Sequence, residues 1–143
     1  MELIVQSRVI HAGTMNASNA TIAAALATID VLEREGPYQR IFSLGLKLMD
    51  GLRQAAKDSG HNLLVQGLGP MFHTGFSDLT AVRNYRETFS YDKAKLSKFV
   101  AAMHDQCIRI IGRGLWYISA AHTEKEIDHT IQVAATVLQN FDR

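Results

Sequence analysis

Small and hydroxyl-bearing residues stand directly before the first long helical pattern of this 143-residue chain. Gly13, Thr14 and Ser18 precede residues 20–34, where apolar side chains recur at helical spacing. Backbone N–H groups and a hydroxyl at a helix start can hold an anion, and the helix dipole favours negative charge there. Ordinary N-capping by Thr14, Ser18 or Asn19 explains the same composition. The segment therefore predicts either an anion site or a capped helix start.

The six histidines do not follow a metal-binding pattern. His122 and His129 are seven residues apart, whereas two histidines on one helix need a spacing near three or four to share a metal. The other four are scattered over the chain: His11, His61, His73 and His104. We therefore expect no metal site.

Nucleophilic catalysis is not indicated either. Ser119 stands three residues before His122, but no nucleophile-elbow motif surrounds the pair, so we expect Ser119 to close a strand. Cys107 lies in an apolar run that favours a buried, inert thiol. A single cysteine also excludes an internal disulfide framework and a cysteine-based zinc site.

The charge balance limits the possible partners. Fifteen Lys and Arg residues face fourteen Asp and Glu residues, so no strong electrostatic attraction to nucleic acid or to an anionic membrane is expected. Apolar runs are shorter than the roughly 18 residues of a membrane span, and the first residues, 1–4, do not form a secretory signal. We therefore expect a cytoplasmic protein that binds neither nucleic acid nor membrane.

Periodicity and helix-breaking residues divide the rest of the chain into helices and short strands. We predict further helices from residue 37 to the Ser59-Gly60 stop, over 92–105, and after a Thr-x-x-Glu capping box at residue 123. Tyr38 and Phe42 are expected in the apolar stripe of the first of these. We predict strands over 62–66, 71–76, 107–111 and 115–119, with residues 77–90 as a surface excursion. This order predicts an α+β fold with helices on one face of a small, mostly antiparallel sheet.

Three motifs resemble one known family. Residues 9–14 (VIHAGT), 65–72 (VQGLGPMF) and 119–124 (SAAHTE), together with the alanine-rich helix 21–30, resemble the C-terminal third of class III pyridoxal-phosphate (PLP) aminotransferases. The similarity is greatest to the glutamate-1-semialdehyde 2,1-aminomutase branch. The resemblance implies the small domain of a fold-type I PLP enzyme, preceded by long helices.

The resemblance also implies site residues. Gly13 and Thr14 match the Gly-Thr that binds the PLP phosphate from the neighbouring subunit of a homodimer. The family usually continues with Gly-Asn-Pro, where this chain has residues 17–19 (ASN), which leaves the loop shape and the substrate preference open. Arg113 stands where some relatives bind the substrate carboxylate; a solvated arginine between two glycines is the alternative.

No lysine of this chain matches the one that binds PLP. All six lysines are expected on polar faces or at helix starts, and the family places its cofactor lysine upstream of the matched stretch. We therefore expect a fragment in which residues 1–35 are a remnant of the large domain and 36–143 are the C-terminal small domain. It would contain no catalytic residue and be inactive alone, whereas the parent enzyme would act on an amino or keto acid.

A non-catalytic interaction or oligomerisation module derived from the same fold is the alternative. Apolar residues near the N-terminus would then be exposed and drive association, so a homo-oligomer is expected. These residues are Leu3, Ile4, Val5, Val9 and Ile10.

Overall fold

The computed structural model describes residues 2–6, 8–10, 12–15 and 18–141, and it divides into two compact units. The first unit comprises residues 1–36 and the second residues 37–143. Assignment of the first unit to a large domain and of the second to a small domain stays a prediction.

The first unit contains helices α1 (Glu2–Val5) and α2 (Asn19–Glu35). The helix predicted over residues 20–34 is therefore confirmed. It ends at Gly36, which takes the left-handed conformation (φ 52°) and donates its N–H to Leu32 O at 3.1 Å. None of the α2 side chains is buried, so its apolar stripe faces solvent. Leu3, Val5, Val9 and Ile10 are exposed as expected, whereas Ile4 is half-buried.

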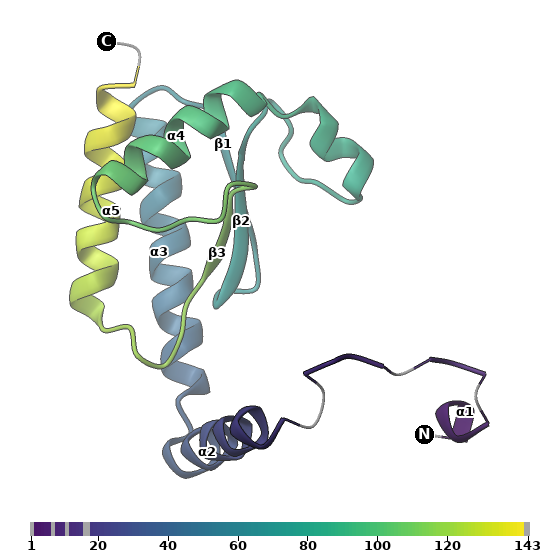
Figure 1. The fold of residues 1–143 in the computed structure, drawn as a ribbon. Coiled ribbons are helices and arrows are strands. Elements are labelled where there is room, and N and C mark those ends of the chain that lie inside the picture. Colours follow the sequence, from purple (N-terminus) through teal and green to yellow (C-terminus); the bar gives the residue numbers. More distant parts are fainter. Residues whose placement is uncertain (1, 7, 11, 16–17, 142–143) are drawn as a thin grey trace. The chain divides into compact units, whose positions relative to one another are not determined.

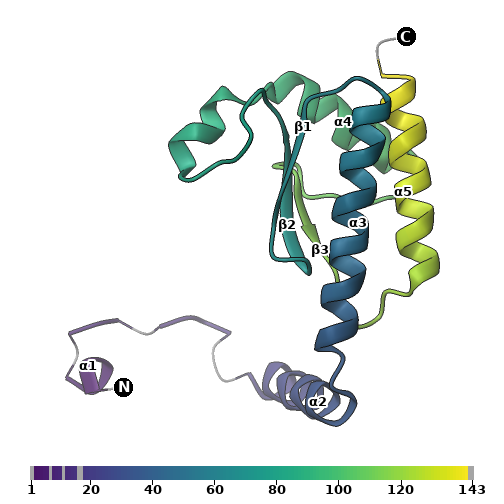
Figure 2. The same ribbon diagram turned by 180° about the vertical axis from the view of Figure 1, so that it is seen from behind.

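The second unit is a layer of helices on a three-stranded antiparallel sheet. The helices are α3 (Tyr38–Asp58), α4 (Lys93–Asp105) and α5 (Glu124–Gln139), and the strands are β1 (Leu63–Gly67), β2 (Met71–Phe76) and β3 (Leu115–Tyr117). The strands pair in the order β1-β2-β3, and Figures 1 and 2 show the three helices on one face of the sheet. The predicted α+β fold is confirmed.

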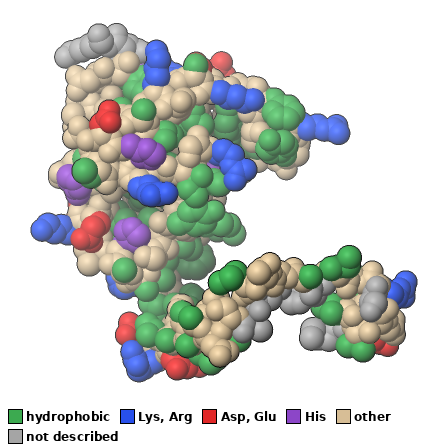
Figure 3. All heavy atoms as spheres, viewed as in Figure 1, with side chains coloured by type: hydrophobic (Ala, Val, Ile, Leu, Met, Phe, Trp, Pro, Cys, Tyr) green, Lys and Arg blue, Asp and Glu red, His purple; other side chains and the backbone are tan. Residues whose placement is uncertain are grey.

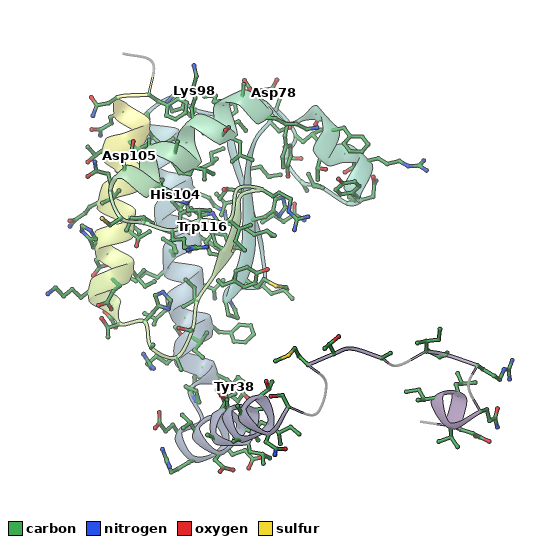
Figure 4. All side chains as sticks on the ribbon, viewed as in Figure 1. Tyr38, Asp78, Lys98, His104, Asp105 and Trp116 are labelled. Atoms are coloured by element: carbon green, nitrogen blue, oxygen red, sulfur yellow. The ribbon has the colours of Figure 1, made fainter. Side chains whose placement is uncertain are left out.

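The central strand β2 alternates between the core and the outer face of the sheet. Phe72 and Thr74 are buried toward the helices, and the Phe72 ring stacks on Trp116 with centroids 5.5 Å apart. Trp116 lies between the sheet and the helices (Figure 4) and donates its indole N–H to Thr74 Oγ1 at 3.1 Å. The Thr74 hydroxyl is therefore buried in the core with a hydrogen-bond partner.

Helix α3 supplies much of the remaining core, and a glycine lets the β1–β2 turn approach it closely. A Cβ atom at Gly45 would lie 2.2 Å from Gly69 O. The buried α3 side chains include Ile41, Leu44, Leu48, Met49 and Leu52. Tyr38 and Phe42, which we expected in the apolar stripe, are 56% and 47% exposed: Tyr38 is the first residue of α3, and Phe42 is turned by about 100° around the helix from the buried Ile41.

The segment after β2, predicted as a surface excursion, forms a lobe that is held by hydrogen bonds. This η1 lobe (residues 77–91) carries the 3₁₀-helix η1 (Tyr85–Ser90), and it projects from the sheet in Figure 1. The Gln66 side chain holds it through two hydrogen bonds of 2.8 Å, one to Val82 O and one from Val82 N. Asn84 Oδ1 caps η1 by accepting from the N–H groups of residues 86 and 87. Arg53 binds the same edge of β1 by donating to Val65 O at 2.8 Å.

The strand predicted over 107–111 is wrong. Only Ile111 forms a bridge, to Leu115. His104 Nε2 lies 2.8 Å from Ile110 O and 3.2 Å from Ile110 N, so the imidazole, not a partner strand, contacts the backbone of Ile110. Cys107 has φ 62° just past the end of α4 and is exposed, so the expected burial of its thiol is also wrong.

The predicted capping box of α5 is confirmed. Thr123 N–H donates to Glu126 Oε2 at 2.8 Å, and the Thr123 hydroxyl bonds to the same carboxylate. These hydrogen bonds lower the pKa of Glu126 below its usual value. The strand expected over 115–119 forms as far as Tyr117.

Candidate functional site

Arg113 lies in a tight turn that is bonded to the central strand. Gly114 N–H donates to Ile111 O at 2.7 Å, and Gly114 O accepts from Thr74 N–H at 2.8 Å. Gly114 has φ 78°, and a Cβ atom there would lie 2.2 Å from Thr74 O. Only glycine meets both conditions, so Gly114 fixes the backbone beside the exposed Arg113.

A cavity of about 490 Å³ adjoins this turn. Its walls come from the outer face of β2, from the η1 lobe, from the start of α4 and from residues 112–115. Arg113 and Lys93 are the charged side chains among the described residues that line it. Its volume is within the usual range for small-molecule sites.

A histidine–tyrosine pair forms part of the cavity wall. His73 Nε2 and Tyr91 Oη are 2.6 Å apart, and the rings are stacked with centroids 5.9 Å apart. Burial lowers the pKa of His73, although a hydrogen bond with the Gln66 backbone opposes this effect. Burial also raises the pKa of Tyr91. Both groups are therefore neutral near pH 7, and the Tyr91 hydroxyl can donate to the imidazole.

Gly13 and Thr14 lie in the first unit, before α2, and both are exposed. Ser18 occupies the N-cap position, but its side chain accepts no hydrogen bond from the helix. Capping by the Ser18 hydroxyl, one of the two readings of this segment, is therefore not found. Three residues of the motif segment, His11, Asn16 and Ala17, lie outside the described residues.

The lysines occupy two kinds of environment. Five are exposed: Lys47, Lys57, Lys93, Lys98 and Lys125. Lys95 is half-buried instead, with Nζ 3.1 Å from His61 Nδ1 and 5.1 Å from the centroid of the Phe76 ring. Its amine can donate to the imidazole and also contacts the aromatic ring face. Its side chain therefore joins α4 to the start of β1.

Ser119 and His122 are close, but their geometry is that of a turn. His122 Nδ1 accepts from the Ser119 backbone N–H at 3.0 Å and lies 3.0 Å from Ser119 Oγ. The nearby Glu126 carboxylate bonds to Thr123, not to the imidazole. Among the described residues, no third group is found that would orient the histidine as a general base.

The described residues offer neither a metal cluster nor a membrane-spanning helix. Across this part of the chain, three or more His, Cys, Asp or Glu residues never gather in a way that could hold a metal ion. None of the helices described has the length and apolar character needed to cross a membrane.

Sequence comparison finds relatives that are named glutamate-1-semialdehyde 2,1-aminomutase. A glutamate-1-semialdehyde 2,1-aminomutase of Desulforapulum autotrophicum is 34% identical over 132 residues, which are 91% of this chain and 31% of that protein. An aminomutase of the same name from Desulfitobacterium hafniense is 30% identical over 144 residues, 99% of this chain and 33% of that protein. No protein-family profile matches the chain.

Solved structures with a similar fold are transaminases. A transaminase with PLP bound has a TM-score of 0.73 and 24% identity, over 93% of this chain and 30% of that one. A β-phenylalanine aminotransferase from Variovorax paradoxus has a TM-score of 0.79 and 19% identity, over 94% and 31% of the two chains. An omega-transaminase from Sphaerobacter thermophilus gives 0.76 and 22%, over 95% and 31%.

Both comparisons cover nearly all of this chain and only part of its relatives. The chain spans about a third of the length of the curated aminomutases that it matches. This confirms the resemblance that the three sequence motifs indicate. This chain is therefore a relative of the glutamate-1-semialdehyde 2,1-aminomutases, and it has the fold of about one third of a PLP-dependent transaminase.

Proposed function

We propose that this chain is the C-terminal part of a PLP-dependent aminotransferase or aminomutase that acts on an amino or keto acid. The observation that supports this most is the match in both sequence and fold over more than nine tenths of the chain. The lysine that binds PLP in the family would lie outside this chain. The chain would then contribute phosphate binding, part of the substrate site and a subunit contact.

The start of α2 would hold the cofactor phosphate. The Thr14 hydroxyl is exposed, the Ser18 hydroxyl is not used as a cap, and α2 is 17 residues long, so hydroxyls and a helix dipole are available there. These features fit a phosphate group. When bound, PLP supplies the electron withdrawal that makes a substrate C–H bond acidic.

Arg113 would orient the substrate through its carboxylate. A guanidinium group can donate two parallel hydrogen bonds to a carboxylate, which fixes both its position and its direction. The turn that carries Arg113 is bonded to β2 through Gly114, so the backbone is preset for this contact. The neutral His73–Tyr91 pair next to it adds polar atoms without a competing charge.

We also propose that the chain associates with a second copy. Tyr38, Phe42 and Leu46 share one face of α3 and are about half exposed, at 56%, 47% and 50%. Large apolar side chains that line up on a surface favour protein–protein contact. The same face supports the second candidate function, a non-catalytic oligomerisation module with this fold.

Adding PLP and an amino donor to the purified chain tests the main proposal. We expect no turnover and no borohydride-reducible adduct on a lysine, but weak PLP binding visible by ³¹P NMR. Thr14→Val should weaken this binding, whereas Thr28→Val should not, because the Thr28 hydroxyl bonds to Ala24 O within α2. Turnover together with an adduct on one lysine would contradict the proposal.

A further inference from the structure

The cavity beside Arg113 has two chemically different sides. One side carries Arg113 on its fixed turn, with Lys93 at the start of α4. The other side is the η1 lobe, which contributes Tyr85 and Phe89. A ligand that fills the cavity would therefore meet positive charge at one end and aromatic rings at the other.

Among the described residues that line the cavity, none is a carboxylate. The ion pairs among the described residues involve Arg34, Lys47 and Arg53, and neither Arg113 nor Lys93 takes part in one. Acidic side chains near the lobe are engaged with other groups. Glu87 accepts from Arg83 N–H and from the Asn84 amide, and Asp92 accepts from Lys95 N–H. Neither Glu87 nor Asp92 lines the cavity, so the charged side chains that face it, Arg113 and Lys93, are both positive.

The aromatic side is exposed and held in place. Tyr85 and Phe89 are 75% and 59% exposed, and their rings meet edge to face with centroids 5.2 Å apart. Lys93 Nζ lies 5.4 Å from the centroid of the Phe89 ring, which brings the cation next to the aromatic pair. Figure 3 shows hydrophobic side chains next to Lys and Arg side chains over this lobe. Because η1 is capped by Asn84, these rings are presented to a ligand without much further ordering.

We propose that this cavity binds a carboxylate that carries an aromatic ring, with the carboxylate on Arg113 and the ring on Tyr85 and Phe89. The size of the cavity, about 490 Å³, accommodates an amino or keto acid with an aryl side chain. The inference rests on the proposed role of Arg113 and adds the substrate class. An amino acid with a short aliphatic side chain would leave the aromatic side uncovered.

Ligand titrations followed by amide NMR shifts test this on the chain itself. The probes are 3-phenylpropanoate, butanoate, which lacks the ring, and 3-phenylpropanamide, which lacks the charge. We expect shifts at Gly112, Gly114 and Thr88, with 3-phenylpropanoate binding about tenfold or more tightly than either comparison compound. Absence of shifts at these amides would overturn the inference.

Two variants and two controls separate the contributions. Arg113→Gln should weaken binding of 3-phenylpropanoate roughly tenfold and remove the preference over the amide. Phe89→Leu should weaken it about threefold or more and leave the preference for charge intact. Arg109→Gln and Tyr117→Leu change exposed residues outside the cavity and should bind as the unchanged chain does.

The outcomes distinguish the two proposals. If both carboxylates bind equally and both need Arg113, the aromatic inference fails while the role of Arg113 stands. If the shifts of the cavity amides show that wild type and Arg113→Gln bind 3-phenylpropanoate with equal affinity, the proposed role of Arg113 fails.

Discussion

The two faces of strand β2 have different surroundings. Phe72 and Thr74 point into the core, where an indole ring stacks on one and donates a hydrogen bond to the other. Met71 and His73 point to the outer face, where one is exposed and the other meets Tyr91 in the cavity wall. A single strand of alternating side chains thus supplies the core contacts that stabilise the fold and the groups that line the candidate site.

Substitutions on the two faces of β2 should differ most in their effect on the free energy of unfolding. Phe72→Ala removes a ring that is 2% exposed and leaves a cavity against Trp116, so we expect a loss of about 3–5 kcal/mol. Met71→Ala, at the neighbouring position that is 52% exposed, should change the free energy of unfolding by no more than about 0.5 kcal/mol. Urea denaturation of both variants measures this. Equal losses would mean that the two faces of β2 do not differ in packing.

Substitutions at two glycines test whether contacts with β2 fix the turn that carries Arg113. Gly114→Ala places a side chain at φ 78° and against Thr74 O, so we expect a loss of about 2 kcal/mol or more and weaker ligand binding at Arg113. Gly112→Ala is the matched control for stability, since a Cβ atom there has no neighbour within 4 Å. Thermal unfolding and the NMR titration together report both effects. A Gly114→Ala protein that behaves like Gly112→Ala would show that the turn is not fixed by β2.

Removal of the Thr74 hydroxyl should lower the free energy of unfolding less than removal of the Phe72 ring. Thr74→Val keeps the shape but leaves the buried Trp116 N–H without its acceptor, which we expect to cost about 1–3 kcal/mol. Thr74→Ser keeps an oxygen and should retain part of this stability. Unfolding in urea, followed by tryptophan fluorescence, distinguishes the two variants. Thr74→Val with unchanged stability would show that this hydrogen bond makes no net contribution.

The smallest expected effect is the pH dependence of stability that comes from His73 on the outer face of β2. Because burial lowers the pKa of His73 below 6.5, the unfolded chain takes up a proton before the folded chain does. The His73 contribution is therefore fully present above pH 6.5 and is lost as the pH falls from there toward the folded-state pKa. His73→Gln should flatten the decline of stability below pH 6.5, whereas Tyr91→Phe should retain it, since burial is the main cause. An unchanged decline in His73→Gln would contradict this assignment.

Local sequence signals predicted most of the fold. The capping box of α5 and the Gly-Pro turn between β1 and β2 depend on residues close in sequence, and both are found. The error at residues 107–111 arose because β-branched residues favour a strand only where a partner strand is available. Here Nε2 of His104 contacts the backbone of Ile110 instead. That contact could not be read from local propensity.

The candidate site could be predicted in part. Arg113 stood out through family resemblance, but its cavity needs β2, the η1 lobe and α4 to be brought together. The His73–Tyr91 pair joins residues 18 apart, and no motif links them. Folding, not sequence spacing, sets such contacts, so their discovery required the structure. The spacing of Tyr85 and Phe89 by four residues was the one local signal of the aromatic side.

The side chains bonded to β1 also limit how copies of this chain can aggregate. An uncovered edge strand offers its N–H and C=O groups to strands of other molecules. On β1 the Val65 carbonyl is taken by Arg53, and Gln66 ties the strand to Val82 of the η1 lobe. At the opposite edge, β3 is only 3 residues long, too short for extensive pairing. Sheet-to-sheet polymerisation is therefore disfavoured, and the proposed association of two copies would use a side-chain surface such as the α3 face.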